Sequence, residues 1–373
     1  FHNFKHTFFY KNPMKFRNST RLTFLSNFSW SNQNVLELLC ETACLGGYQS
    51  YYFPKPISVF RKRTVSELED YPKGCITSDL KVLPLIFNKI PLLKHAQIKI
   101  LCKYILQSRS QKKQDILFYN NLDGIDVIAK KLRSHFKKLV FICADYSEID
   151  DRFNASAKIA DKILVIPKSM IEPIEKVFPG KSILWPQPTS SQMVQQTDKD
   201  RVEQLLLKIP KPRIIYAGSL TGRVDQSMYG RIAENMPTVS FVSVGDNFSR
   251  KNKNNFQIPW LKKNDMLFFL SQCQVGFLPY DLSKLHNLHC VPLKLLDCMS
   301  AGLPVVITKL KNIDDFHPFV YLAETEKELL RALETALSEK KDAEIRIKRK
   351  KRAEMHRTEN LVQKLDLLIE KMV

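Results

Sequence analysis

Apolar residues occur along most of the chain in short continuous runs, separated by stretches in which they recur with helical spacing. In the first half, we expect strands at residues 21–28, 48–53, 115–120, 138–144, 162–167 and 182–188. Residues 34–47 have the spacing of an amphipathic helix and end at a glycine pair. The runs are continuous and do not alternate with polar residues, which is typical of parallel strands buried on both faces.

A second series of strands follows a polar segment and is expected at residues 212–220, 238–245, 275–280 and 303–308. Each strand lies next to a helical stretch. Two consecutive series of this kind predict an α/β fold with two doubly wound, Rossmann-like domains. A chain of 373 residues is also long enough for two domains of ordinary size.

The predicted boundaries follow from these series. Residues 1–20 form an N-terminal extension, 21–188 the first domain, 189–210 a linker and 211–352 the second domain. Residues 353–373 are helical and carry apolar positions on one face, so we expect this last helix to dock. The first residue is Phe1, so residues 1–13 are interpreted as an upstream extension, a truncated start or a segment at a membrane interface.

Charge is the unusual property of the composition. Lys and Arg number 58 against 38 Asp and Glu, which gives a formal net charge of +20. This predicts an anionic partner: nucleic acid, an anionic membrane surface or a phosphorylated small molecule. The alternative is that the charge only keeps the protein dispersed in water.

The remaining composition argues against several classes of protein. No apolar run approaches the ~18 residues that span a bilayer, and no secretory signal pattern is visible. Most of the eight cysteines lie inside apolar runs, which predicts reduced thiols in a cytoplasmic protein. Cys40 and Cys44 lie one helical turn apart, but no Cys or His pair of zinc spacing is near them, so we expect no metal.

Candidate chemistry lies at the ends of the second series of strands, where doubly wound folds bind ligands. The first strand ends in a loop with Gly218 and Gly222, and Arg223 follows in the same loop. Glycine lets backbone amides approach an anion, and arginine pairs with phosphates. Another strand ends at Tyr280. The alternative interpretation of each loop is an ordinary turn that binds no ligand.

The stretch "HCVPLKLLDCMSAGLPVVIT" (289–308) carries the strongest signal. Lys294 lies in the first turn of a predicted helix, where the helix dipole already favours an anion. Asp297 follows on the same face and can accept hydrogen bonds from ribose hydroxyls. The alternative is a capped helix with two solvated charges.

The ordered segments "RIIYAGSLTGRVD", "MPTVSFVSVGD", "FLPYD" and "VPLKLLDCMSAGLPVVIT" resemble the donor domain of GT-B glycosyltransferases. In that superfamily a Pro-x-Lys-x-x-Glu element followed by Ala-x-Gly-x-Pro-Val-Val binds the nucleotide sugar. The matching residues here are Pro292, Lys294, Asp297, Ala301, Gly302, Pro304, Val305 and Val306. The resemblance also implies that the last helix crosses back to the first domain, which would bind the acceptor.

The chain departs from the retaining members of this superfamily, because His289 stands where their first glutamate would be and Asp297 at the second. The string "LKLLDCMSAGLP" is also similar to the inverting, xanthan-type glucuronosyltransferases. That resemblance implies that Lys294 contacts the donor diphosphate, that Tyr280 lines the site and that Asp145 is the catalytic base. Asp150 and Asp151 compete with Asp145 for this role.

The resemblance implies a metal-independent, hexosyltransferase-like enzyme with no cofactor beyond its nucleotide-sugar substrate, for which UDP-sugar is favoured. We expect a glycan or lipid-linked acceptor, a role in polysaccharide biosynthesis, and a cytoplasmic position on the inner face of the plasma membrane. His289 is expected to contact the donor sugar. Trp260 either lies beside the nucleotide base or packs in the core. Two alternatives remain: a nucleotide-sugar 2-epimerase on the same fold, and a basic, non-catalytic binding protein. The absence of RNA-binding motifs counts against the second.

Overall fold

The computed structural model divides into two compact units, residues 1–190 with 358–373 and residues 191–357. The structure describes residues 8–10, 20–26, 34–54, 57–58, 74–78, 81–82, 91–107, 115–120, 125–145, 148–190, 198–245, 252–340 and 344–372. Most of the predicted N-terminal extension therefore lies outside the described residues, as do residues 191–197 of the predicted linker.

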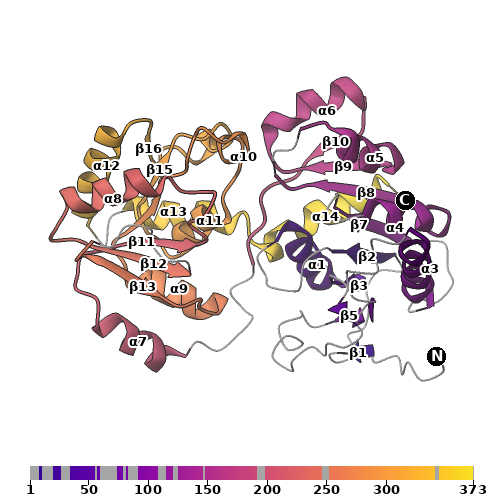
Figure 1. Ribbon diagram of the computed structural model, residues 1–373, viewed down its shortest axis with the longest axis horizontal. Helices are drawn as coiled ribbons and strands as arrows, with labels where there is room; N and C mark the ends of the chain where they lie inside the picture. Colours follow the sequence, from indigo (N-terminus) through magenta and orange to yellow (C-terminus); the bar gives the residue numbers. More distant parts are fainter. Residues whose placement is uncertain are drawn as a thin grey trace. The chain divides into compact units, whose positions relative to one another are not determined.

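The first unit is built on one sheet with the order β1-β5-β3-β2-β7-β8-β9-β10 (Figure 1). Its strands are β1 (Phe8–Tyr10), β2 (Arg21–Leu25), β3 (Gln49–Phe53), β5 (Cys75–Ser78), β7 (Asp115–Tyr119), β8 (Lys138–Cys143), β9 (Lys162–Val165) and β10 (Ser182–Leu184). The strands from β5 to β10 are all parallel, and β1 is an antiparallel addition at the edge. A separate pair joins β4 (Ile57–Ser58) and β6 (Lys81–Val82).

Helices cover both faces of this sheet. The helices are α1 (Val35–Leu45) and α14 (Val362–Glu370) on one face and α3 (Pro91–Gln107), α4 (Ile125–Leu132), α5 (Asp151–Ile159) and α6 (Ile171–Val177) on the other. Successive strand residues point to opposite faces. In β2, Leu22 and Phe24 therefore pack with α1 and α14, whereas Leu25 packs with the other layer. This double burial explains the continuous apolar runs in the sequence.

The predicted return of the C-terminal helix to the first unit is confirmed. Leu365, Leu368 and Ile369 of α14 belong to the same buried cluster as α1. The Tyr48 hydroxyl, just after α1, donates a hydrogen bond of 2.5 Å to the Asp366 carboxylate. The last turn of the chain is therefore part of the first unit's core.

The second unit has a six-stranded, fully parallel sheet with the order β13-β12-β11-β14-β15-β16. Its strands are β11 (Arg213–Gly218), β12 (Ser240–Gly245), β13 (Asn255–Ile258), β14 (Val275–Leu278), β15 (Val305–Thr308) and β16 (Tyr321–Ala323). Its helices are α7 (Lys199–Leu207), α8 (Gln226–Asn235), α9 (Lys263–Ser271), α10 (Leu285–Leu288), α11 (Leu293–Ser300), α12 (Glu326–Ser338) and α13 (Glu344–Glu354). The predicted architecture of two doubly wound, Rossmann-like domains is confirmed.

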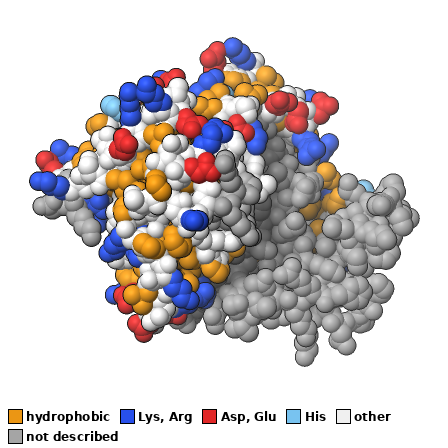
Figure 2. Space-filling view, turned by 60° about the vertical axis from the view of Figure 1, so that its left-hand side comes forward, with side chains coloured by type: hydrophobic (Ala, Val, Ile, Leu, Met, Phe, Trp, Pro, Cys, Tyr) orange, Lys and Arg blue, Asp and Glu red, His pale blue; other side chains and the backbone are white. Residues whose placement is uncertain are grey.

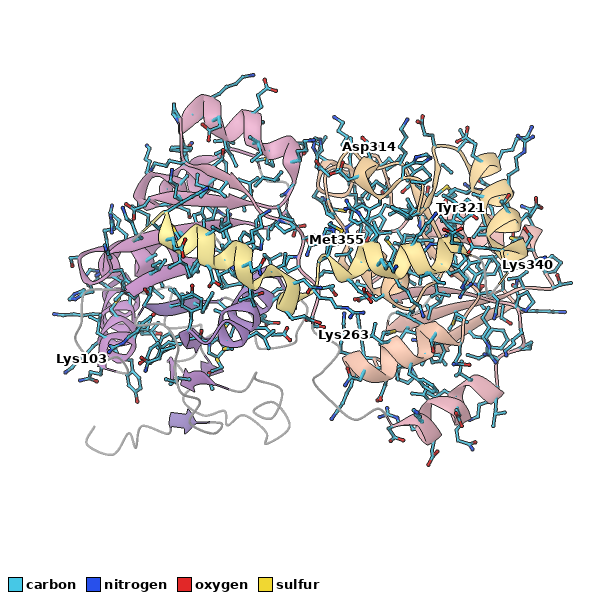
Figure 3. All side chains as sticks on the ribbon, turned by 180° about the vertical axis from the view of Figure 1, so that it is seen from behind. Lys103, Lys263, Asp314, Tyr321, Lys340 and Met355 are labelled. Carbon is cyan, nitrogen blue, oxygen red and sulfur yellow. The ribbon has the colours of Figure 1, made fainter. Side chains whose placement is uncertain are left out.

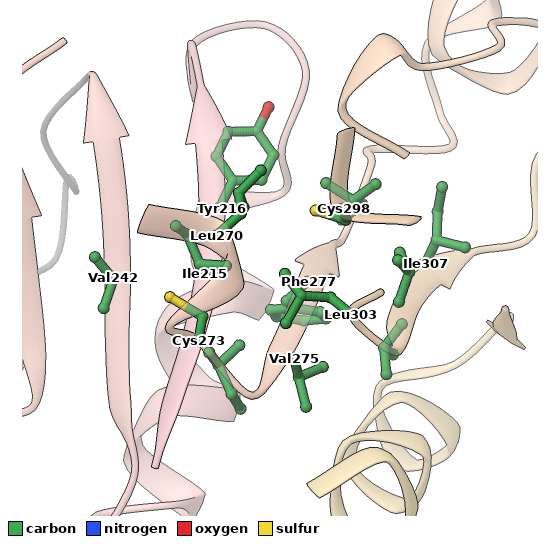
Figure 4. Packing of buried hydrophobic residues seen from close by; sticks show 14 of the residues in the cluster. Ile215, Tyr216, Val242, Leu270, Cys273, Val275, Phe277, Cys298, Leu303 and Ile307 are labelled. Atoms are coloured by element: carbon green, nitrogen blue, oxygen red, sulfur yellow. The ribbon is translucent and has the colours of Figure 1, made fainter. Parts of the chain in front are cut away.

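The core of the second unit is one continuous cluster between the helices and the sheet, and Figure 4 shows part of it around Ile215, Phe277 and Ile307. Helix α7 lies within the segment expected to be a linker, yet it places Val202 and Leu206 in this cluster. Among the described residues, no helix is both long enough and apolar enough to cross a bilayer.

One buried arginine fixes α13 to the second unit. Arg349 is 1% exposed and donates hydrogen bonds of 2.9 and 3.0 Å to the two carboxylate oxygens of Glu339. Its Nε also donates to the Phe319 carbonyl at 2.7 Å. Because both partners satisfy each other's hydrogen bonds, the buried charges are compensated.

The docking of α14 gives a stability prediction with an internal control. Leu365 is fully buried, whereas Leu367 on the same helix is 57% exposed. We expect Leu365→Ala to lower the free energy of unfolding by about 3 kcal/mol, the typical cost of a buried leucine truncation. Leu367→Ala should change it by less than about 0.5 kcal/mol. Urea unfolding followed by circular dichroism checks this, and equal effects of the two changes would contradict the docking.

Candidate functional site

The strand order of the second unit reverses between β11 and β14, and in open α/β sheets ligands bind at the carboxyl ends of the strands at such a reversal. The backbones of the two loops are joined. The Asp225 N–H donates to the Pro279 carbonyl at 3.2 Å, and the Asp281 N–H donates to the Arg223 carbonyl at 2.9 Å. These bonds hold the loop after β11 in a fixed relation to the loop after β14.

Asn287, which the sequence analysis did not single out, strengthens this connection. Its side chain is fully buried and donates hydrogen bonds of 2.9 Å to the carbonyls of Arg223 and Asp281. Its Oδ1 accepts from Arg223 Nη1 at 3.3 Å. The predicted site residue Arg223 is therefore oriented by an amide on α10. No motif marks this asparagine in the sequence, because its role depends on joining the nearby Asp281 carbonyl to the carbonyl of Arg223, which is 64 positions away.

Lys294 and Gly218 lie together at the end of β11. A Cβ atom on Gly218 would lie 2.1 Å from Lys294 Cε and 2.8 Å from its Nζ. Gly218 also has a φ of +126°, which disfavours any other residue. Lys294 Nζ lies 5.6 Å from the centroid of the Tyr216 ring. Helix α11 begins one residue before Lys294 without a side-chain cap from Pro292.

Asp297, the predicted partner of a ribose, forms an ion pair with Lys263. Their Oδ1 and Nζ atoms lie 2.6 Å apart, and the side chains are 16% and 18% exposed. Lys263 begins α9, and Figure 3 labels it there. No motif in the sequence marks Lys263. Because this pair is neutral overall, Asp297 does not offset the positive charges of Lys294 and Arg223.

An aromatic side chain lies at the same edge of the sheet. Trp260 follows β13 and is 52% exposed, so it is not a core indole. It lies against Gly245 at the end of β12, where a Cβ atom would be 2.8 Å from the indole Cζ2. The absence of a side chain at Gly245 leaves room for the Trp260 indole against the backbone.

Tyr280 and His289 are less exposed than their predicted roles in ligand binding suggest. Tyr280 is 3% exposed and belongs to the core cluster, with its backbone N–H donating to Thr308 Oγ1 at 3.0 Å. His289 is half-buried and follows α10, and its carbonyl accepts a 2.6 Å hydrogen bond from Asn312. Burial lowers the pKa of His289, and the nearby Lys311 ammonium lowers it further.

Asp145 belongs to the first unit. It follows β8 and is exposed, and its carbonyl lies 3.4 Å from Cys143 Sγ. Its competitor Asp150 is the N-cap of α5 and accepts a hydrogen bond of 2.8 Å from the Phe153 N–H. Asp151 is exposed in the first turn of the same helix. Of these carboxylates, Asp150 has a clear structural role.

The positive charge of the chain does not form one continuous surface on the face that Figure 2 shows. There, Lys and Arg side chains lie in separate groups, interspersed with Asp, Glu and apolar side chains.

No protein-family model matches the sequence, and no curated protein matches it. Solved structures are similar over nearly the whole chain. Sucrose-phosphate synthase from Thermosynechococcus elongatus has a TM-score of 0.68 at 13% identity, covering 94% of this chain and 99% of that one. The N-terminal domain of Candida albicans trehalose-6-phosphate phosphatase has a TM-score of 0.65 at 10% identity, covering 98% and 99%.

A third similar structure is the α,α-trehalose 6-phosphate synthase from Burkholderia multivorans, with a TM-score of 0.63 at 11% identity and coverage of 95% and 97%. The chain has the GT-B fold. At these identities the likeness concerns the fold, and the chemistry must be argued from the residues of the site.

The surroundings of His289 give a prediction for its titration. The fold favours the neutral imidazole, so the NMR titration midpoint of His289 should lie below the ordinary value of about 6.5. Since the unfolded chain then binds the proton more readily, His289 makes the folded state less stable as the pH falls through this range.

Lys311→Ala should raise the midpoint of His289 part of the way back. The matched control is Lys309→Ala. The Lys309 ammonium is already paired with Glu324 at 2.6 Å, so its removal should leave the titration midpoint of His289 unchanged. A midpoint at or above about 6.5 in the unaltered protein would contradict this description of the site.

Proposed function

We propose that the chain is a glycosyltransferase that moves a sugar from a UDP-sugar to a hydroxyl of a glycan or lipid-linked acceptor. The observation that carries this proposal is the close approach of Lys294 to Gly218 at the reversal point of the second sheet. Similar structures support the choice of donor, since an α,α-trehalose-phosphate synthase from Burkholderia vietnamiensis is described as UDP-forming.

The diphosphate of the donor would bind at the start of α11. The first-turn N–H groups of this helix have no side-chain cap from Pro292, and the helix dipole places partial positive charge there. Lys294 adds a full positive charge, and the absence of a side chain at Gly218 leaves room for Lys294 against the end of β11. Together these groups would stabilise the negative charge that develops on the departing UDP.

The ribose and the base of the donor would contact two further side chains of the second unit. The Asp297 carboxylate can accept hydrogen bonds from ribose hydroxyls while Lys263 balances its charge. The half-exposed Trp260 offers an aromatic face for the uracil ring. His289, close to neutral at physiological pH because its pKa is lowered, would contact the donor sugar by hydrogen bonding rather than by charge. Tyr280 would support the site from the core.

In the proposed reaction, Asp145 takes the proton of the acceptor hydroxyl as its oxygen bonds to the anomeric carbon and the bond from that carbon to UDP breaks. Asp145 is favoured over Asp150 because Asp150 already caps α5. We propose inversion at the anomeric carbon, since His289 occupies the position of a glutamate in retaining members. Retention is described for a trehalose-6-phosphate synthase of the same fold.

Gly218 provides the first test. Ala at this position would push the flexible end of Lys294 away from β11. We expect Gly218→Ala to weaken UDP binding about 10- to 100-fold, the value of a charge-assisted hydrogen bond of about 1.5–3 kcal/mol. Gly222→Ala is the matched control, because Gly222 also has a positive φ (+75°) but a Cβ there meets nothing within 4 Å. Its UDP affinity should change less than about threefold.

Calorimetry and thermal unfolding with UDP measure these affinities. The unaltered chain should be stabilised by UDP and not by a single-stranded oligonucleotide. The reverse result would favour the basic binding protein over the glycosyltransferase. Equal losses of affinity in the two glycine variants would show that backbone strain, and not Lys294, is responsible.

Asp145 provides the second test. Hydrolysis of UDP-glucose, with water in place of the acceptor, should release β-glucose first, as ¹H NMR can follow. Asp145→Asn should lower the rate about 10²- to 10⁴-fold and leave UDP affinity unchanged, because a general base acts on the reaction and not on nucleotide binding. Asp151→Asn, at an exposed carboxylate nearby in sequence, is the control and should keep the rate. Initial release of α-glucose, or full activity of Asp145→Asn, would contradict the assignment.

A further inference from the structure

Three cysteine thiols converge in the core of the first unit, and none of them is assigned above to the reaction. Cys40 and Cys44 come from α1, and Cys75 is the first residue of β5. Their Sγ atoms all lie within 4.8 Å of one another, and those of Cys40 and Cys75 are 3.8 Å apart. The three residues are only 0%, 4% and 2% exposed.

The fold accounts for this convergence. Residues four apart on a helix share one face, so Cys40 and Cys44 both point from α1 toward the sheet. Strand β5 pairs with β3 so that Cys75 stands opposite Ser50. Cys75 belongs to the same buried cluster as α1, which places its thiol on the covered face. The 30 residues between Cys44 and Cys75 hide this neighbour from any spacing rule.

We propose that Cys40, Cys44 and Cys75 bind a single soft, thiophilic cation of the Cu(I) class. Metal–thiolate bonds of about 2.3 Å in a trigonal arrangement put the sulfurs about 4 Å apart. The Cys40 and Cys75 sulfurs are 3.8 Å apart, and all three lie within 4.8 Å of one another. Within the described residues, no His, Asp or Glu joins the three thiols. Zinc sites take four ligands, whereas soft sulfur donors select Cu(I).

Binding of the ion would make up to three metal–sulfur bonds and release to solvent the protons that the binding thiols carry. Neither sulfur nor metal changes oxidation state, so no oxidant or reductant takes part. The ion would cross-link α1 to β5 in the folded chain and so stabilise the first unit.

The test uses the full-length, reduced protein, refolded from urea without oxygen in the presence of Cu(I) and the competing chelator bicinchoninate. We expect one equivalent of Cu(I) per chain, and X-ray absorption showing three sulfur ligands at about 2.3 Å. Cys75→Ala should lower the affinity at least 100-fold. Cys143→Ala is the matched control, because Cys143 is equally buried in the same unit (3% exposed) but lies outside the cluster. It should keep full affinity.

Circular dichroism shows whether each variant folds, and Cys44→Ala, on the other element of the cluster, replaces Cys75→Ala if that variant does not. The proposal is overturned if the unaltered chain leaves Cu(I) on the chelator, if the bound metal has nitrogen or oxygen ligands, or if Cys143→Ala loses as much affinity as the cluster variant. Any of these results would make the three thiols ordinary apolar packing.

Discussion

The missing side chain of Gly218 is the constraint on which the proposed site depends. A single methyl group at this position would occupy the space of Lys294 Cε, and the positive φ excludes most other residues independently. The strand order gives this constraint its place, because β11 ends where the order of the strands reverses, the point at which open α/β sheets bind ligands. A cation, a bare backbone and a helix start therefore meet at one point although 76 residues separate Gly218 from Lys294.

The surrounding polar contacts hold that point in place before any ligand arrives. Asn287 ties the loop after β11 to the loop after β14, and Lys263 neutralises Asp297. A site whose groups are already oriented loses little free energy on binding a charged ligand. The ion pair also gives Asp297 a defined geometry without adding net negative charge beside Lys294, where we propose that the diphosphate binds.

Much of the architecture could be predicted from the sequence, because strands buried on both faces leave continuous apolar runs. All ten strands expected from such runs are present, as is the helix expected at residues 34–47. Six strands were not predicted, because each has only two to four residues and leaves little signal: β1, β4, β5, β6, β13 and β16. Helix α7 was assigned to a linker, because the apolar face of that helix rests on only two buried residues, Val202 and Leu206.

The candidate site was predictable only where its residues lie in one local motif. Lys294 and Asp297 share a helix start, so their spacing was informative. Lys263, Asn287 and the pairing of Cys75 with α1 depend on contacts between distant segments, which no local pattern encodes. The measurement that tests the central claim most directly is a crystal structure of the protein with bound UDP. Our account predicts the diphosphate within hydrogen-bonding distance of Lys294 Nζ and the first turn of α11, above Gly218. A diphosphate bound elsewhere on the chain, with this corner empty, would contradict it.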